Sequence, residues 1–64
     1  MQRLRLNMIL DREQLGKVIG YYMYRSQEME LNRPIIDGVY IQRKQLGETP
    51  PESLTLLLEW NEEQ

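Results

Sequence analysis

One stretch decides the fold expected for this chain, residues 11–31, which read DREQLGKVIGYYMYRSQEMEL. Residues in it recur at spacings of three and four, the period of a helix with one buried face. These are Leu15, Val18, Ile19, Tyr22, Ser26 and Met29. Asp11 can cap the first turn, and Asn32 followed by Pro34 can end the helix. The pattern therefore predicts one long helix over residues 12–31.

Three further segments have the pattern of β-strands. Residues 2–10 alternate between apolar and polar, residues 38–44 are rich in strand formers, and residues 53–60 are the most apolar. We therefore expect residues 53–60 in the centre of the sheet. The sequence predicts an α+β fold, a single βαββ domain over residues 1–64. Its three-stranded, mostly antiparallel sheet has the order 1-3-2, with the long helix packed on one face.

This arrangement makes the strand of residues 53–60 antiparallel to the strand of residues 2–10. It places Arg3 and Arg5 across from Glu59 and the residues around it on the outer face of the sheet, which is a favourable cross-strand arrangement.

The composition favours assembly. A core built from 64 residues rarely contributes more than about 3–5 kcal/mol of stability without additional support. The chain contains no Cys and no His, so disulfides and the usual zinc ligands are excluded as that support. We therefore expect a homo-oligomer, with a dimer as the first hypothesis and another protein partner as an alternative.

The charge is uneven along the chain, although the net charge is only −2. Residues 1–44 hold all eight basic side chains against five acidic ones, and residues 45–64 hold five acidic and no basic ones. No apolar run is long enough to span a membrane, and the first residues lack the apolar centre of a signal peptide. The sequence predicts a cytoplasmic protein without membrane contact.

The chemistry of catalysis is poorly represented. Without His or Cys, the most common general base and the thiol nucleophile are missing. Ser26 and Ser53 have no base at a predictable spacing, and no glycine-rich phosphate loop is present. We expect no enzyme activity, no cofactor and no metal site.

Two glycines mark a candidate contact with a second copy or a partner. Gly16 and Gly20 lie one turn apart on the flank of the predicted helix, next to Met23, and Tyr21 and Tyr24 point outward beside them. Such a notch allows a close approach of another backbone, and exposed tyrosines are enriched at interfaces. The alternatives are a crossing loop of the same chain, a tolerated cost in helix stability, and solvated tyrosines.

The open face of the predicted sheet offers a second candidate site. It carries Arg3, Arg5, Tyr40, Gln42 and Lys44, which suggest nucleic-acid binding through basic strands and one stacking aromatic. The isoelectric point near 5.0 makes nucleic acid the weaker hypothesis. The alternatives are an ordinary solvated face and a cross-strand charge network with Glu59.

The length, the single helix and the βαββ order resemble the topology of dodecins, small flavin-binding proteins that assemble as hollow shells. The resemblance implies a small-ligand-binding assembly, in which Trp60 is a candidate for stacking on a ligand ring. The alternative is that Trp60 closes the end of the core. Taken together, the sequence favours a non-catalytic protein-interaction or regulatory module.

Overall fold

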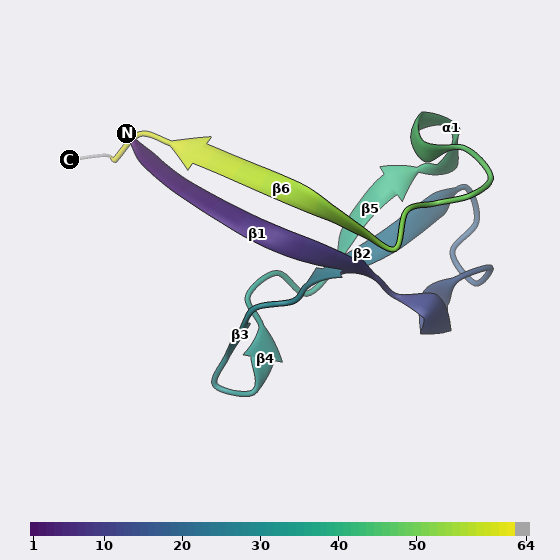
Figure 1. Ribbon diagram of the computed structural model, residues 1–64, viewed down its shortest axis with the longest axis horizontal. Coiled ribbons are helices and arrows are strands. Elements are labelled where there is room, and N and C mark those ends of the chain that lie inside the picture. Colours follow the sequence, from purple (N-terminus) through teal and green to yellow (C-terminus); the bar gives the residue numbers. More distant parts are fainter. Residues whose placement is uncertain (63–64) are drawn as a thin grey trace.

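The computed structural model describes residues 1–62 and shows a mostly β protein with a curled, four-stranded antiparallel sheet (Figure 1). The strands of this sheet, in spatial order, are β5 (Val39–Gln42), β2 (Tyr21–Ser26), β1 (Gln2–Leu10) and β6 (Ser53–Trp60). The remaining elements are a 3-10 turn η1 (Arg12–Gln14), the hairpin strands β3 (Met29–Glu30) and β4 (Arg33–Pro34), and a single helical turn α1 (Arg43–Leu46).

The predicted α+β fold is wrong, because residues 12–31 form no long helix. Strands make up 50% of the structure and helical residues 11%, and no helix within residues 1–62 reaches seven residues. Gly16 and Gly20 have φ angles of +84° and +83°, a left-handed conformation that a continuous right-handed helix does not contain. Beyond them, the aromatic-rich segment of β2 forms a strand whose buried Tyr22, Tyr24 and Ser26 alternate with period two.

The predicted strand order is also wrong. The expected central strand is found as β6, at one edge of the sheet, whereas β1 lies inside it. β1 pairs with β2 through Met8–Leu10 and with β6 through Gln2–Ile9. The antiparallel pairing of β1 with β6 agrees with the prediction, and so does the position of Arg3 directly opposite Glu59.

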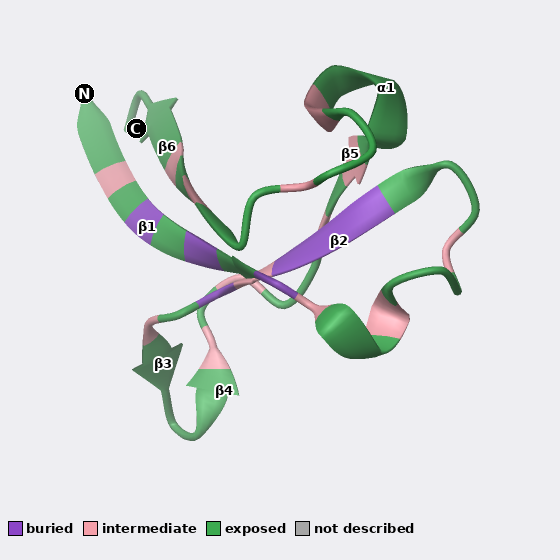
Figure 2. Ribbon diagram, turned by 45° about the vertical axis from the view of Figure 1, so that its right-hand side comes forward, coloured by how far each residue is buried: buried purple, intermediate pink, exposed green. Residues whose placement is uncertain are grey.

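The core forms on one face of the sheet, where alternate residues of β1 meet alternate residues of β2. Leu6, Met8 and Leu10 are buried there together with Tyr22 and Tyr24. Figure 2 shows the buried parts of β1 and β2 in purple. Partly buried side chains surround them: Leu4, Ile36, Val39, Ile41, Leu46, Leu54 and Leu56. The alternation predicted for residues 2–10 is therefore present. However, β2 and the segment between β5 and β6 complete the core, and no long helix packs on it.

Two tyrosine hydroxyls hold the segment that covers this core. The Tyr22 hydroxyl donates to the Gly47 carbonyl at 2.6 Å, and the Tyr24 hydroxyl donates to the Pro51 carbonyl at 2.8 Å. The Arg43 guanidinium lies 4.7 Å from the centre of the Tyr22 ring. These contacts fix α1 and the following loop over the core. The connection from β5 to β6 therefore covers the core in place of the helix predicted for residues 12–31.

A tight turn joins β3 to β4. Leu31 and Asn32 have φ angles of 53° and 65°, as the two central residues of a two-residue hairpin turn require. Asn32, which was expected to end a helix, therefore takes a left-handed conformation in a hairpin turn instead.

Candidate functional site

The residues of the predicted helix-flank contact do not share one surface. Gly16 and Gly20 lie in the loop before β2, and a Cβ atom at either would meet no atom within 4 Å. Their left-handed backbone accounts for glycine at both positions. Tyr21 is partly exposed at the start of β2, whereas Met23 and Tyr24 are buried on opposite faces of that strand. The helix on which the contact was placed is absent.

The predicted basic surface is divided between separate parts of the molecule. Strand pairing places Arg3, Arg5, Tyr40 and Gln42 on the sheet face opposite the core. However, β1 pairs with β2 only through Met8–Leu10, so the two arginines lie beyond that pairing, far along the strand from β5. Lys44, expected in a strand, lies in α1. The structure therefore does not gather these side chains into one patch.

Trp60 is the last residue of β6, opposite Gln2, and its side chain is 47% exposed. It does not close the core, so the alternative interpretation of this residue is wrong. The βαββ order that carried the resemblance to dodecins is absent. Ligand stacking by Trp60 stays a prediction without support from the fold.

The most exposed apolar part of the sheet is its extension away from the core. We define the β1–β6 arm as residues 2–5 of β1 and residues 57–60 of β6, and the body as the rest of the sheet with its covering loop. Figure 1 shows the two strands of the arm side by side, running from the body towards the N-terminus. The arm is therefore a two-stranded ribbon whose β6 side is an edge of the sheet.

The hydrogen-bond pattern shows which backbone groups this edge presents. The Leu10 amide donates to the Glu52 carbonyl at 2.9 Å, so even-numbered residues of β1 and β6 bond to each other. By alternation, the amide and carbonyl groups of Thr55, Leu57 and Glu59 point away from β1. Within residues 1–62, no other strand pairs with them. β6 thus offers an open edge along its whole length.

The side chains of β6 add apolar surface to that edge. Leu57 is 48% exposed and Leu58 is 37% exposed, and Trp60 adjoins them at the end of the strand. Glu59 is the one charged residue of β6, and its carboxylate accepts from Arg3 of the neighbouring strand at 2.9 Å. The charge is therefore already paired within the arm. The edge lacks the lysines, prolines and short length by which proteins normally prevent edge-to-edge pairing.

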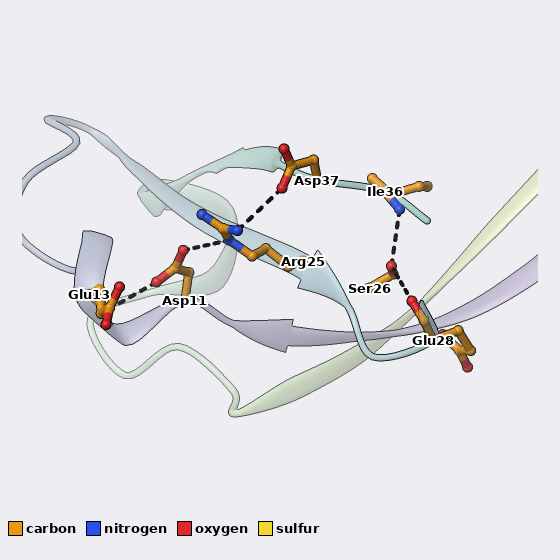
Figure 3. Close-up of polar contacts among 7 residues, drawn as sticks. All are labelled: Asp11, Glu13, Arg25, Ser26, Glu28, Ile36 and Asp37. Carbon is orange, nitrogen blue, oxygen red and sulfur yellow. Dashed lines mark hydrogen bonds and ion pairs between the residues drawn. The ribbon is translucent and has the colours of Figure 1, made fainter. Parts of the chain in front are cut away.

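The polar contacts elsewhere are structural. Asp11 accepts from the Glu13 amide and from the Arg25 guanidinium, which also donates to Asp37, so one cation joins the end of β1, β2 and the segment before β5 (Figure 3). The Ser26 hydroxyl donates to the Glu28 carbonyl and accepts from the Ile36 amide. In the described part of the chain, no group of three potential metal ligands occurs, and no helix has the length and apolar content to cross a membrane.

Burial acts on one of the tyrosines of the core. It raises the pKa of the Tyr24 hydroxyl above its ordinary value, with a smaller contribution from the neighbouring Tyr22. The hydroxyl is held neutral as a hydrogen-bond donor, which suits a structural role.

The chain matches no family model, no curated protein and no solved structure. The candidate site therefore depends on the geometry of the arm alone. Sequence reasoning missed β6 as an edge because it used apolar content to place the strand centrally. The signal that could have located the site is Leu57, an apolar residue on the otherwise polar face of this strand.

Proposed function

We propose that this chain is a protein-interaction module without catalytic activity of its own, which works as a homo-oligomer through the β1–β6 arm. The observation that carries the proposal is the open outer edge of β6, eight residues long, with its exposed apolar side chains. An exposed strand of this kind is a template for pairing with a strand of another chain.

The backbone supplies the first part of the argument. Thr55, Leu57 and Glu59 each present an amide and a carbonyl to the open edge. Another strand can pair with all of them at once without a change in the arm. Pairing of this kind gives affinity through main-chain hydrogen bonds, and side chains on the two faces give specificity.

The apolar side chains supply the second part. Leu58 and Trp60 continue the core face outward beyond the buried residues, and Leu57 lies on the opposite face. A strand added at this edge would remove part of their surface from water, at about 25 cal/mol for each Å² of apolar area. Since a core of this size contributes little stability, this gain is a substantial fraction of the total.

Other exposed apolar side chains do not form such a surface. Ile19 is almost fully exposed in the loop before β2, and Met29, Leu31 and Ile35 are exposed on or next to the β3–β4 hairpin, whose strands have only two residues each. β5, at the opposite edge of the sheet, is only four residues long. The β6 edge is the longest apolar strand edge in the described part of the chain.

The test compares two substitutions that make the same chemical change. Leu57→Lys places a charge on the proposed contact, and Ile19→Lys places the same charge in an exposed loop of the body. Mass measured by light scattering during gel filtration, at several concentrations, should show a wild-type assembly. Leu57→Lys should shift it to the mass of one chain, and Ile19→Lys should leave it unchanged.

A wild-type protein that keeps the mass of a single chain at every concentration would overturn the proposal. So would a Leu57→Lys variant that assembles as well as the wild type. Circular dichroism of both variants shows whether each is folded, and Leu57→Thr provides a neutral substitution of the same edge position.

A further inference from the structure

We propose that the occupant of the β6 edge is the β6 strand of a second copy, antiparallel to the first about a two-fold axis, with Leu57 opposite Leu57 of the second copy. This inference rests on the proposed function and deepens it, because it names the partner and the register. The result is one continuous antiparallel sheet that runs through both molecules.

The outward-facing residues limit the possible registers. Thr55, Leu57 and Glu59 present their backbone groups to the edge, so an outward residue of one copy must lie opposite an outward residue of the other. In an antiparallel pair the numbers of two opposite residues always have the same sum. Because the outward residues are odd-numbered, this sum must be even. A two-fold axis that passes at any residue of β6 satisfies this rule.

Apolar matching favours the axis at Leu57. In that register Leu56 faces Leu58 of the second copy, and Leu54 faces Trp60, so each apolar side chain of β6 meets another. An axis at Leu56 would instead place Trp60 opposite Glu52 and Leu57 opposite Thr55. An axis at Leu58 would place Leu57 opposite Glu59 and would shorten the paired region.

Charge favours the same register. With the axis at Leu57, Glu59 faces the uncharged Thr55 of the second copy. The two Glu59 carboxylates are then four residues apart along the strands, about 13 Å, which exceeds the Debye length of about 8 Å at physiological salt. With the axis at Glu59, the two carboxylates would lie directly opposite each other, and like charges in that position are destabilising.

The remaining edges explain why assembly stops at two copies. The pairing of β6 with β6 uses the same surface on both molecules and closes by symmetry. The other edge strand, β5, has four residues, and the free edge of β1 carries Arg3 and Arg5. Arginines and short strands discourage further pairing. A contact between β6 and the free edge of β1 would be head-to-tail and would give an open chain of molecules.

Single cysteine substitutions can identify the register, because the natural chain contains no cysteine that could form other disulfides. Residues that exchange both hydrogen bonds in an antiparallel pair have Cα atoms about 5.5 Å apart, which suits a disulfide. We expect Leu57→Cys to form a disulfide with itself under oxidised glutathione. A mixture of Thr55→Cys and Glu59→Cys should give mainly the mixed disulfide between the two variants.

The yield of the mixed disulfide should exceed the yield of the disulfide that either variant forms with a second copy of itself by about tenfold. This ratio corresponds to a free-energy difference of about 1.4 kcal/mol between registers. Gln45→Cys, an exposed position in α1 on the body, is the control for random collision and should cross-link slowly. Mass spectrometry separates the three products by mass, and gel filtration of the unoxidised variants shows whether each still assembles.

The outcomes separate this inference from the proposed function. An assembly in which the Leu57→Cys variant links mainly to the Thr55→Cys variant, or mainly to the Glu59→Cys variant, would overturn the register and leave the interaction module standing. A ladder of higher masses would overturn the closed pair. A protein with the mass of one chain, in which no variant cross-links faster than the Gln45→Cys control, would overturn both proposals. Self-linking at Leu57→Cys together with the mixed disulfide of the other two variants supports the pair as stated.

Discussion

Met8 in the body and Leu58 in the β1–β6 arm occupy positions of the same kind, on the same face of two paired strands, yet Met8 is fully buried and Leu58 is 37% exposed. The difference lies in what covers them. Over the body, α1 and the loop that follows it are held by the hydroxyls of Tyr22 and Tyr24. Within residues 1–62, no segment extends in the same way over the end of the arm (Figure 2).

This comparison shows that the apolar pattern of a strand determines which of its faces is apolar. It does not determine which segment, if any, covers that face. The alternation of β1 continues from Leu4 to Leu10, and burial increases along it as the strand enters the body. The body uses that face for its core. The arm leaves it partly exposed, next to the open edge of β6.

The largest difference between the two regions is expected on truncation of their apolar side chains. Met8→Ala removes packed atoms from the core and should lower the free energy of unfolding by about 2–5 kcal/mol. Leu58→Ala should cost less than about 1 kcal/mol in the dilute single chain, because its side chain is already partly hydrated. Urea unfolding followed by circular dichroism at low protein concentration measures both, and equal losses would contradict the division into body and arm.

An intermediate effect is expected when the cover of the body is loosened. Tyr24→Phe removes the hydroxyl that donates to the Pro51 carbonyl and should lower the free energy of unfolding by about 1 kcal/mol. Tyr40→Phe makes the same chemical change on a ring that is mostly exposed, and it should have almost no effect. If Tyr24→Phe is as stable as Tyr40→Phe, the hydroxyl does not hold the loop.

The same tyrosine gives the body a dependence on alkaline pH. Because burial raises the pKa of Tyr24 above its ordinary value of about 10, the folded protein keeps this proton to a higher pH than the unfolded chain does. The stabilisation is complete below the unfolded pKa and is lost as the pH rises through the folded pKa. The urea midpoint should therefore fall above about pH 10, and less steeply in Tyr24→Phe. If the urea midpoints of the wild type and of Tyr24→Phe fall with pH at the same slope, groups other than Tyr24 cause the loss of stability at alkaline pH.

The smallest effect is expected from the ion pair of the arm. Arg3 and Glu59 have side chains that are 69% and 42% exposed, so a double-mutant cycle should give a coupling of about 0.2–1 kcal/mol that falls with added salt. Asp11 and Arg25 in the body should couple more strongly, at about 1 kcal/mol after screening at the exposed guanidinium, because the carboxylate is nearly buried. The reverse order would mean that the arm is the more rigid region.

Local pattern was sufficient for part of the fold. The strands predicted at residues 2–10 and 53–60 are found there as β1 and β6, because strict alternation and apolar strand formers act within a few residues of each other. The pairing of Arg3 with Glu59 also followed, since an antiparallel register together with opposite charges leaves few choices.

The sequence by itself also determined the special backbone positions. Two glycines before β2 allow the loop to take a left-handed conformation, and Asn32 allows the tight turn between β3 and β4. The tyrosine-rich segment after Gly20 can form a helix or a strand by its spacing alone, because a stripe of period 3.6 and an alternation of period two both fit it.

Only the tertiary structure decided between a helix and a strand for this segment. The physical reason is long-range pairing. As a strand, β2 joins β1 to β5, and its Tyr22 and Tyr24 reach carbonyls more than 20 residues further along the chain. As a helix, the same residues would have lost those contacts. The position of β6 at an edge was decided in the same way, because β2 occupies the other side of β1 and leaves the most apolar strand with one unpaired edge.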